Sequence, residues 1–233
     1  AYNTDGGWLS LSTQQVVDNC RRFVLEEGFR GVKIKIGSNS PGADLDRVEA
    51  VRAAIGPNVK LAVDANGIWD LPTAVRVGRR LADYDVLWIE EPLWYDDPWG
   101  HAQLARAIAT PIALGEQLYS RHAFRDFLHQ GAVHYVQPDV TRLGGVTEWL
   151  QVADMAHGYR LPVAAHVGDM GQVHVHTAYA HPACRILEYI PWIRTAFEEP
   201  VTVVDGAYVL PQRPGAGTTP RQDAFERFQR PLP

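Results

Sequence analysis

The sequence predicts an α/β protein in which eight parallel strands close into a single barrel. Short apolar runs alternate with longer amphipathic segments along most of the 233 residues, which is the pattern of repeated βα units. Eight such runs can be counted, as in an eight-stranded barrel. A doubly wound open sheet is the alternative, but its early glycine-rich phosphate turn is missing, because Gly6-Gly7 is followed by Trp8.

The first half of the chain is expected to alternate strands and helices from its first residues onward. Ser12 or Thr13 is the expected cap of a helix that reaches about Glu27 and ends at Gly28. The other expected elements are a strand over Ala1–Asp5, a strand over Gly31–Gly37, a helix over Ala43–Ile55 that stops at Gly56-Pro57, a strand over Val59–Ala65, a helix that opens at Pro72, and a strand over Val86–Glu90.

The second half continues the same alternation after a loop over Leu93–Gly100. The expected elements are a helix to about Ile108, a strand over Pro111–Leu114, a helix from Tyr119 or Ser120 to near Gly131, a strand over Val133–Gln137, a helix over Gly145–His157, a strand over Leu161–His166, a helix around Gln172–Ala180, and a strand over Cys184–Tyr189.

The end of the chain departs from this pattern. Two β runs flank Asp205-Gly206 within Val201–Leu210, which predicts a hairpin. The segment Pro211–Pro220 is rich in proline and glycine and is expected to be irregular. We therefore divide the chain into a barrel domain, residues 1–200, and a C-terminal hairpin and tail, residues 201–233.

The composition favours small-molecule chemistry. A net charge of −5 and a pI near 6.0, without runs of like charge, argue against binding to nucleic acid or to an anionic membrane. Cys20 and Cys184 are far apart and form no CxxC motif, so a disulfide framework is not expected and a reducing, cytoplasmic setting is. No apolar run approaches the roughly 20 residues of a membrane span.

The strand expected over Gly31–Gly37 carries an unusual pair of charges. Its residues alternate, so the apolar side chains share one face and Lys33 and Lys35 share the other. One interpretation is a half-exposed edge strand whose charges deter aggregation. The other is that the two ammonium groups meet a set of carboxylates, because lysine is seldom buried without a partner.

Polar side chains recur at the carboxyl ends of the expected strands, where barrel enzymes build their sites. An isolated acid after a strand is most often a helix cap, which is our interpretation of Glu91 and Asp97. Independent caps would not recur at nearly every strand end, about one βα unit apart. The residues in question are Lys33, Lys35, Asp64, Glu90, Glu116, Asp139, His166 and Glu188.

Three of these acids predict a metal site. Asp64, Glu90 and Glu116 follow consecutive strands and offer the oxygen ligands that a hard divalent cation prefers. Magnesium is the expected metal, and zinc is disfavoured because no cysteine or histidine is among the three.

The remaining residues predict acid–base chemistry. The charge of Lys33 is expected to favour the neutral amine of Lys35, which makes Lys35 a candidate base. Asp139 and His166 follow neighbouring strands and can pair, with Asp139 setting the imidazole tautomer.

In order and spacing, these residues resemble the enolase superfamily and, within it, the mandelate racemase subgroup, over nearly the whole chain. The motifs that carry the resemblance are Lys33-Ile-Lys35, Asp64-Ala-Asn66, Glu90-Glu-Pro92, Gly115-Glu116, Gln137-Pro-Asp139 followed by Gly144-Gly145, Ala165-His166, and Leu187-Glu188.

The resemblance implies a modified (β/α)7β barrel that binds one Mg²⁺ and removes the proton α to a carboxylate, giving an enediolate. It implies that Lys35 is the base on one face of the substrate and His166, oriented by Asp139, the base or acid on the other. Lys33 would neutralise the substrate carboxylate, Glu188 would hydrogen-bond it, and Asn66 would also contact the substrate. A cytoplasmic homo-oligomer is expected.

Two fates of the enediolate separate the enzyme hypotheses. If His166 protonates a departing β-hydroxyl, the enzyme is an acid-sugar dehydratase that forms a 2-keto-3-deoxy acid, which family analogy favours. If a proton returns to the α-carbon, it is a racemase or epimerase. The segments Trp94–Asp97 and His166–Met170 are candidate contacts for a polyol, or else loop packing and a helix start.

One expectation concerns what this chain lacks. Family members carry an N-terminal α+β capping domain that closes over the barrel mouth, and this chain starts at the first barrel strand. The hairpin over Val201–Leu210 resembles the segment that packs on that domain. A hypothesis of another class is therefore a barrel fragment that binds Mg²⁺ without catalysis. A second metal site at His174, His176 and His181 is not expected, because i and i+2 positions of a helix point apart.

Overall fold

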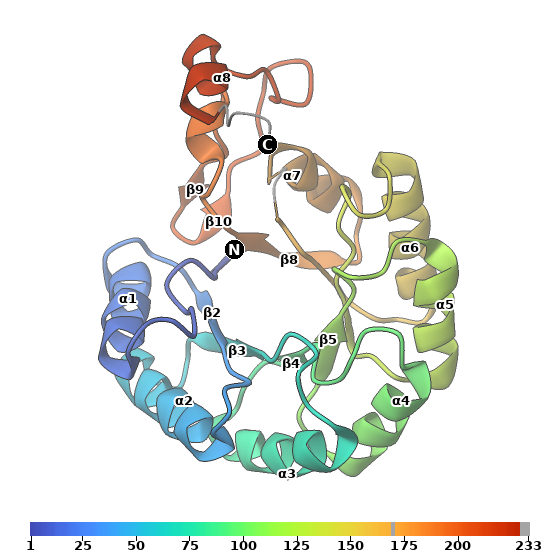
Figure 1. Cartoon of the computed structure of the whole chain (residues 1–233). Helices are drawn as coiled ribbons and strands as arrows, with labels where there is room; N and C mark the ends of the chain where they lie inside the picture. Colours follow the sequence, from blue (N-terminus) through green and yellow to red (C-terminus); the bar gives the residue numbers. More distant parts are fainter. Residues whose placement is uncertain (169–170, 229–233) are drawn as a thin grey trace.

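The computed structural model describes residues 1–168 and 171–228, and the first eight strands in this part of the chain form a closed barrel (Figure 1). Every strand pairs in parallel with the next, and β8 closes the ring on β1, where Tyr2 lies opposite Glu188. This confirms the barrel and rules out the open sheet. The strands are β1 (Tyr2–Asn3), β2 (Gly31–Lys35), β3 (Lys60–Asp64), β4 (Ile89–Glu90), β5 (Ile112–Leu114), β6 (Tyr135–Val136), β7 (Val163–Ala165) and β8 (Cys184–Tyr189).

Helices follow the first seven strands and surround the barrel, as Figure 1 shows. They are α1 (Thr13–Leu25), α2 (Pro41–Ile55), α3 (Leu71–Leu81), α4 (Pro98–Ala107), α5 (Arg121–Gln130), α6 (Val146–Gly158) and α7 (Gly171–Ala180), with a 3-10 turn, η1 (Ala82–Tyr84), after α3. This order of elements is the expected (β/α)7β arrangement. None of the helices in the described residues is long and apolar enough to cross a membrane.

Local capping explains where several helices begin. Ser12 forms a capping box with Gln15 at the start of α1, and Ser120 accepts a hydrogen bond from the Ala123 amide at the start of α5. Helix α2 begins at Pro41, two residues before the predicted start, because Ser40 is the capping residue and proline fits the first helical turn. Most strands are shorter than predicted, since only part of each apolar run takes part in the sheet.

The edge-strand interpretation of β2 is wrong. The strand lies between β1 and β3, and all five of its residues are in register with β3. Both faces of the strand are buried. Ile34 lies in the large apolar core that includes the surrounding helices, and Lys33, on the opposite face, is only 1 % exposed. The lysine face of the strand therefore points into the barrel.

A small aromatic cluster seals the inside of the barrel beneath the carboxyl ends of the strands. Ala62 and Trp88 precede Asp64 and Glu90 by two positions, so they share the inward face one layer lower. Trp88 is fully buried, and its ring meets that of Tyr2 edge-on at 5.3 Å. This aromatic layer is the floor of the polar end of the barrel.

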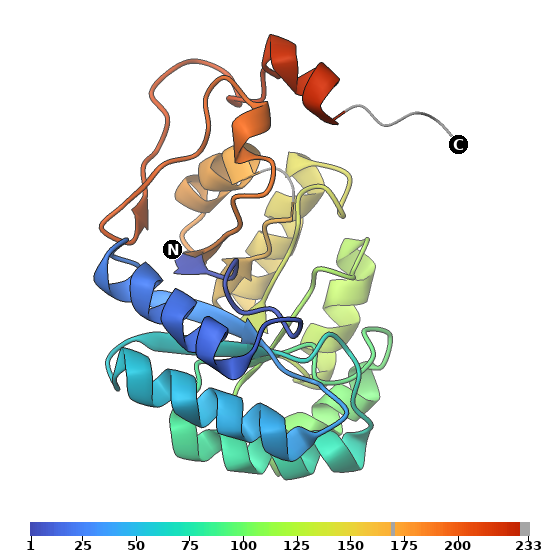
Figure 2. The same cartoon turned by 60° about the vertical axis from the view of Figure 1, so that its left-hand side comes forward.

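The C-terminal segment follows β8 and packs against the outside of the barrel next to this strand. After η2 (Arg194–Ala196), an antiparallel hairpin joins β9 (Val203–Val204) to β10 (Ala207–Tyr208), which confirms the turn predicted at Asp205-Gly206. Helix α8 (Gln222–Phe228), which was not predicted, lies beyond the hairpin and stands clear of the barrel helices (Figure 2).

The described contacts of the hairpin are with the barrel. The buried Tyr208 hydroxyl donates to the Glu188 carbonyl at 2.5 Å, and the Tyr179 hydroxyl of α7 donates to the Tyr208 carbonyl at 2.6 Å. The hairpin therefore stands between α1 and α7, where a further helix would otherwise cover β8 (Figure 1). The division at residue 200 and the packing of the tail against a capping domain stay predictions.

We expect Tyr208→Phe to lower the free energy of unfolding by about 1–3 kcal/mol, because the Glu188 carbonyl would lose its buried donor. Urea denaturation followed by circular dichroism would measure the change. Val204→Ala, at a half-exposed position of the same hairpin, is the control and should change stability by less than about 0.5 kcal/mol. Equal stability of Tyr208→Phe and the wild type would show that this hydrogen bond contributes nothing to the stability of the barrel.

Candidate active site

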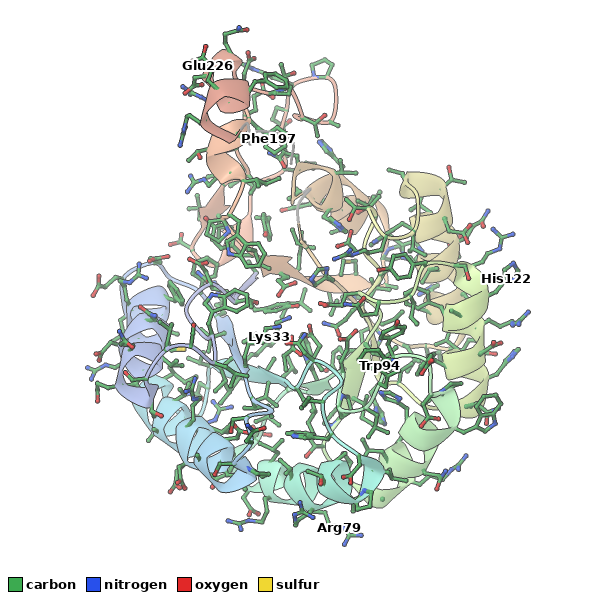
Figure 3. All side chains as sticks on the ribbon, viewed as in Figure 1. Lys33, Arg79, Trp94, His122, Phe197 and Glu226 are labelled. Atoms are coloured by element: carbon green, nitrogen blue, oxygen red, sulfur yellow. The ribbon has the colours of Figure 1, made fainter. Side chains whose placement is uncertain are left out.

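The carboxyl ends of the strands bring the predicted site residues together at one mouth of the barrel. Register alone places Lys35 beside Asp64, and Asp64 beside Glu90, on three adjacent strands. Figure 3 shows Lys33 near the centre of the ring. Glu116, Asp139 and His166 lie one to three residues beyond the ends of β5, β6 and β7, and Glu188 lies within β8.

Lys33 is the buried countercharge of the mouth. Its Nζ lies 2.5 Å from Glu90 Oε1, 2.8 Å from Glu188 Oε1 and 3.6 Å from Asp64 Oδ2. Burial by itself would lower the pKa of Lys33, but the charges of Glu188, Glu90 and Asp64 outweigh it and raise that pKa well above its usual value. Lys33 therefore stays an ammonium ion inside the barrel.

Lys35 lies nearer to the surface of the same mouth. Its side chain is 13 % exposed, its Nζ contacts Asp64 Oδ2 at 2.5 Å, and it lies 5.6 Å from the centre of the Trp8 ring. Burial opposes ionisation of Asp64, but the charges of Lys35 and Lys33 and its hydrogen bonds lower its pKa. The effect of Lys33 on the protonation of Lys35 stays a prediction, and the structure shows that each lysine is already paired with a carboxylate.

Glu90 is held from below by residues of the barrel floor. Its Oε2 accepts hydrogen bonds from Trp88 Nε1 at 3.1 Å and from Gln137 Nε2 at 2.7 Å, while Oε1 faces Lys33. Burial raises the pKa of Glu90 to about 7, although Lys33 opposes the shift. Gln137 belongs to a recognised motif, but its role beneath Glu90 is visible only in the structure.

Glu116 depends on the glycine before it. Gly115 has a φ of +149°, and a Cβ atom there would lie 2.6 Å from the Gln137 carbonyl oxygen. Any side chain at this position would push β5 away from β6. The glycine thus lets the chain pass close to its neighbour and deliver Glu116 to the mouth.

The structure confirms the predicted pairing of Asp139 with His166. His166 Nδ1 lies 2.7 Å from Asp139 Oδ2, and His166 Nε2 lies 2.9 Å from Glu116 Oε2 and 3.8 Å from Glu188 Oε2. Burial would lower the pKa of His166, but Asp139, Glu116 and Glu188 raise it well above its usual value. Hydrogen bonds from His166 and His174 hold the pKa of Asp139 below its usual range despite burial.

The interpretation of Glu91 as a helix cap is wrong, whereas that of Asp97 is confirmed. Asp97 accepts a hydrogen bond from the Gly100 amide at 2.7 Å at the start of α4. Glu91 is buried, has a φ of +40°, and caps no helix. Burial, together with the charges of Glu116 and the other nearby acids, raises its pKa to about 9. In the sequence, only its position directly after Glu90 indicates that Glu91 belongs to the site.

The outer residues of the site are less enclosed. Asn66 is exposed, and its backbone amide donates to Asp64 Oδ1 at 2.9 Å. Trp94, labelled in Figure 3, is 56 % exposed and packs against Tyr95 with ring centres 4.8 Å apart. The candidate polyol contacts at Asp169 and Met170 lie outside the described residues.

The charge balance of the mouth fits a divalent cation. Two ammonium groups and two imidazoles, those of His166 and His174, face six carboxyl groups: Asp64, Glu90, Glu91, Glu116, Asp139 and Glu188. Burial is the main cause of the raised pKa values of Glu90 and Glu91, and the charges of the neighbouring acids add to it. Within residues 1–168 and 171–228, no three aspartate, glutamate, histidine or cysteine side chains are arranged so that they could hold a metal ion together. The carboxylates of the mouth contact Lys33, Lys35 and His166 instead. The donors themselves are the oxygens that Mg²⁺ prefers.

Fold and site together define a (β/α)7β barrel with an acidic mouth, a lysine pair and an Asp–His pair. Residues 15–224 match the family model described as enolase C-terminal domain-like, and the chain belongs to this family. The resemblance to the enolase superfamily and its mandelate racemase subgroup is thereby confirmed.

Similar proteins of known identity include sugar-acid dehydratases. The chain is 39 % identical over 223 residues to L-talarate/galactarate dehydratase of Salmonella typhimurium, covering 96 % of this chain and 55 % of that protein. It is 32 % identical over 235 residues to arabinonate dehydratase of Saccharolobus solfataricus, covering 98 % and 63 %. The crystal structure of L-talarate dehydratase from Polaromonas sp. JS666, complexed with Mg and L-glucarate, superposes with a TM-score of 0.91 at 39 % identity, covering 97 % and 62 %. This chain thus spans a little over half the length of these relatives.

We expect Lys33→Met to lower the free energy of unfolding by about 3–5 kcal/mol, because it leaves buried carboxylates without their countercharge. Chemical denaturation at neutral pH would measure the loss. Lys60→Met, at the exposed first residue of β3, is the matched control and should stay within about 0.5 kcal/mol of the wild type. A loss below about 1 kcal/mol in Lys33→Met would contradict the central position given to this ion group.

Proposed function

We propose that this chain is the barrel part of a Mg²⁺-dependent acid-sugar dehydratase, which converts an aldonate or aldarate to a 2-keto-3-deoxy acid. The observation that carries the proposal is the placement of two proton-transfer groups, Lys35 and the Asp139–His166 pair, around one carboxylate-lined mouth. The similarity to talarate/galactarate and arabinonate dehydratases supports it. The activity is that of the protein that contains this barrel, since the chain spans only part of those relatives.

The metal site of the proposal consists of Asp64, Glu90 and Glu116. When bound, Mg²⁺ would supply positive charge beside the substrate carboxylate as the α-carbon loses its proton. The structure of a Polaromonas dehydratase complexed with Mg supports this cofactor. Lys33 would add a second fixed positive charge, because its surrounding acids keep it protonated.

The reaction follows from the two proton-transfer groups. The neutral amine of Lys35 would take the proton from the α-carbon, leaving an enediolate. His166, whose pKa is raised by Asp139, Glu116 and Glu188 against the effect of burial, would be the acid. As the β carbon–oxygen bond breaks, the His166 proton would pass to the departing hydroxyl, which leaves as water. The resulting enol would become the 2-keto acid as its C2 hydroxyl loses a proton and the β-carbon gains one.

Glu188 is proposed to act on the substrate indirectly, by holding Lys33 in place. Its Oε1 accepts from the Thr4 hydroxyl at 2.6 Å as well as from Lys33, and its Oε2 accepts from the Val167 amide at 3.1 Å. Burial opposes its ionisation, yet Lys33 and His166 lower the pKa of Glu188 to about 2. An ionised Glu188 cannot donate to a substrate carboxylate, so we propose that it acts mainly by holding Lys33. Asn66 at the rim stays the proposed substrate contact.

The setting of the enzyme is part of the proposal. Cys20 and Cys184 are both free, which supports a reducing, cytoplasmic location. A homo-oligomer is proposed from the family resemblance.

A screen of acid sugars with Mg²⁺ in deuterated buffer tests the function. Formation of a 2-keto acid from an aldonate or aldarate would support dehydration, whereas deuterium at the α-carbon with a change of configuration and no keto acid would favour the racemase or epimerase. Binding of Mg²⁺ without either product, in the protein that includes any capping domain, would overturn the enzyme proposal and leave the non-catalytic barrel.

The two proton-transfer roles predict different exchange behaviour. With an active acid sugar, His166→Asn should stop dehydration but keep α-proton exchange with solvent deuterium, because Lys35 still removes the proton. Lys35→Ala should lose both. Exchange measured by proton NMR that is lost in His166→Asn and kept in Lys35→Ala would reverse the assignment of the base.

We expect Glu90→Gln to abolish Mg²⁺ binding, because an amide replaces one of three anionic ligands and removes charge from the mouth. Titration calorimetry would measure the binding. Glu49→Gln, at an exposed position of α2, is the control and should bind like the wild type. Wild-type affinity in Glu90→Gln would contradict the ligand assignment.

A further inference from the structure

A second histidine reaches the carboxylate of the Asp–His pair. His174 lies on α7 and is completely buried, and its Nε2 is 3.3 Å from Asp139 Oδ1. Its other ring nitrogen, Nδ1, is buried and has no hydrogen-bond partner among the described residues. The Nε2 atom of His174 therefore lies at the carboxylate that also contacts His166.

The two oxygens of Asp139 are divided between different donors. Oδ2 faces His166 Nδ1 at 2.7 Å and the Gly168 amide at 3.4 Å. Oδ1 accepts from the amide and the hydroxyl of Thr141, at 2.8 and 2.7 Å, and faces His174 Nε2. The carboxylate is thus held on the side away from His166 by Thr141 and His174.

The proton on His174 follows from this arrangement. The Val140 amide also points at His174 Nε2, at 3.3 Å, so two orientations of the ring proton compete. A lone pair on Nε2 would accept from Val140 but would face the Asp139 carboxylate with like polarity. A proton on Nε2 makes a charge-assisted hydrogen bond to the buried carboxylate, which is the stronger interaction. Nε2 of His174 is therefore the donor.

We propose that His174 is a positioning residue for the Asp139–His166 pair. Its Nε2–H holds Oδ1 of Asp139, so that Oδ2 is left to the Nδ1–H of His166 and the Nε2 of His166 faces Glu116 and the mouth. Partners of this kind set the orientation and tautomer of a working imidazole. The catalytic meaning of the inference rests on the proposed function, but the hydrogen-bond arrangement does not.

The other buried histidines show that this contact is specific. His181 also meets an aspartate, Asp154 at 3.1 Å, but that carboxylate is 76 % exposed at the surface. His101 Nδ1 donates to the backbone carbonyl of Asp97, the capping residue of its own helix, at 2.8 Å. His174 differs because its carboxylate partner is buried and is the one that contacts His166.

The test is the protonation pattern of the histidine rings in the full chain, read from nitrogen-15 chemical shifts with no substrate present. The variants are His174→Leu, which removes the donor, and His174→Gln, whose amide N–H can replace Nε2–H. His176→Leu on the same helix is the control for volume, because no contact links it to Asp139. Near-ultraviolet circular dichroism of each variant reports whether the fold is retained.

In the wild type we expect a proton on Nε2 of His174 and, because three acids surround His166 and favour its charged form, on both ring nitrogens of His166. His174→Leu should shift the nitrogen-15 signal of His166 Nδ1, which reports its hydrogen bond to Asp139, while His174→Gln and His176→Leu should keep the wild-type pattern. A wild-type His174 that is protonated on Nδ1 alone would overturn the proposal. So would an unchanged His166 in a folded His174→Leu. If His174→Leu does not fold, the wild-type tautomer and the glutamine variant decide.

Kinetics on an active acid sugar give a second readout. His174→Leu should lower kcat by about 10- to 100-fold with little change in KM, and His174→Gln should restore most of it. An unchanged kcat in a folded His174→Leu would overturn the positioning role. If the screen finds no turnover but the nitrogen-15 signal of His166 Nδ1 still depends on His174, the proposed function fails and the positioning role stands.

Discussion

The structure depends on the burial of one positive charge among several negative ones. Lys33 is almost completely buried, and three carboxylates surround its ammonium group. Removing either sign would leave the other buried and unpaired, which is far more costly than breaking an exposed ion pair. The ion pairs of Lys33 with Asp64, Glu90 and Glu188 therefore hold β2, β3, β4 and β8 around one centre.

The barrel supplies the geometry that this ion group requires. Parallel strands in register carry the charged residues to one end, and the alternation of side chains puts small and aromatic residues directly below them. Trp88 links the two layers, since its ring belongs to the floor and its Nε1–H donates to Glu90. The hairpin acts from outside by binding the backbone of Glu188 through Tyr208.

Much of the fold and the main site residues could be predicted from the chain because they follow local rules. Periodicity, capping residues and the Asp205-Gly206 turn located the elements, and strand-end positions selected Asp64, Glu90, Glu116, Asp139 and His166. Glu91 was misjudged because an acid after a strand usually caps a helix, whereas its positive φ and burial were not visible locally. The role of His174 cannot be predicted from the spacing of the three histidines, because that spacing does not show the distance from His174 to Asp139.

The sequence by itself determined the barrel, the order of charged groups around it and the family, because each depends on residues within one element or on the spacing of successive units. Only the tertiary structure decided which charges pair: Lys33 with three acids, Lys35 with Asp64, and Asp139 with two histidines. Such pairing depends on distances between residues far apart in the chain. The closed sheet sets those distances through its register, and no single segment encodes them.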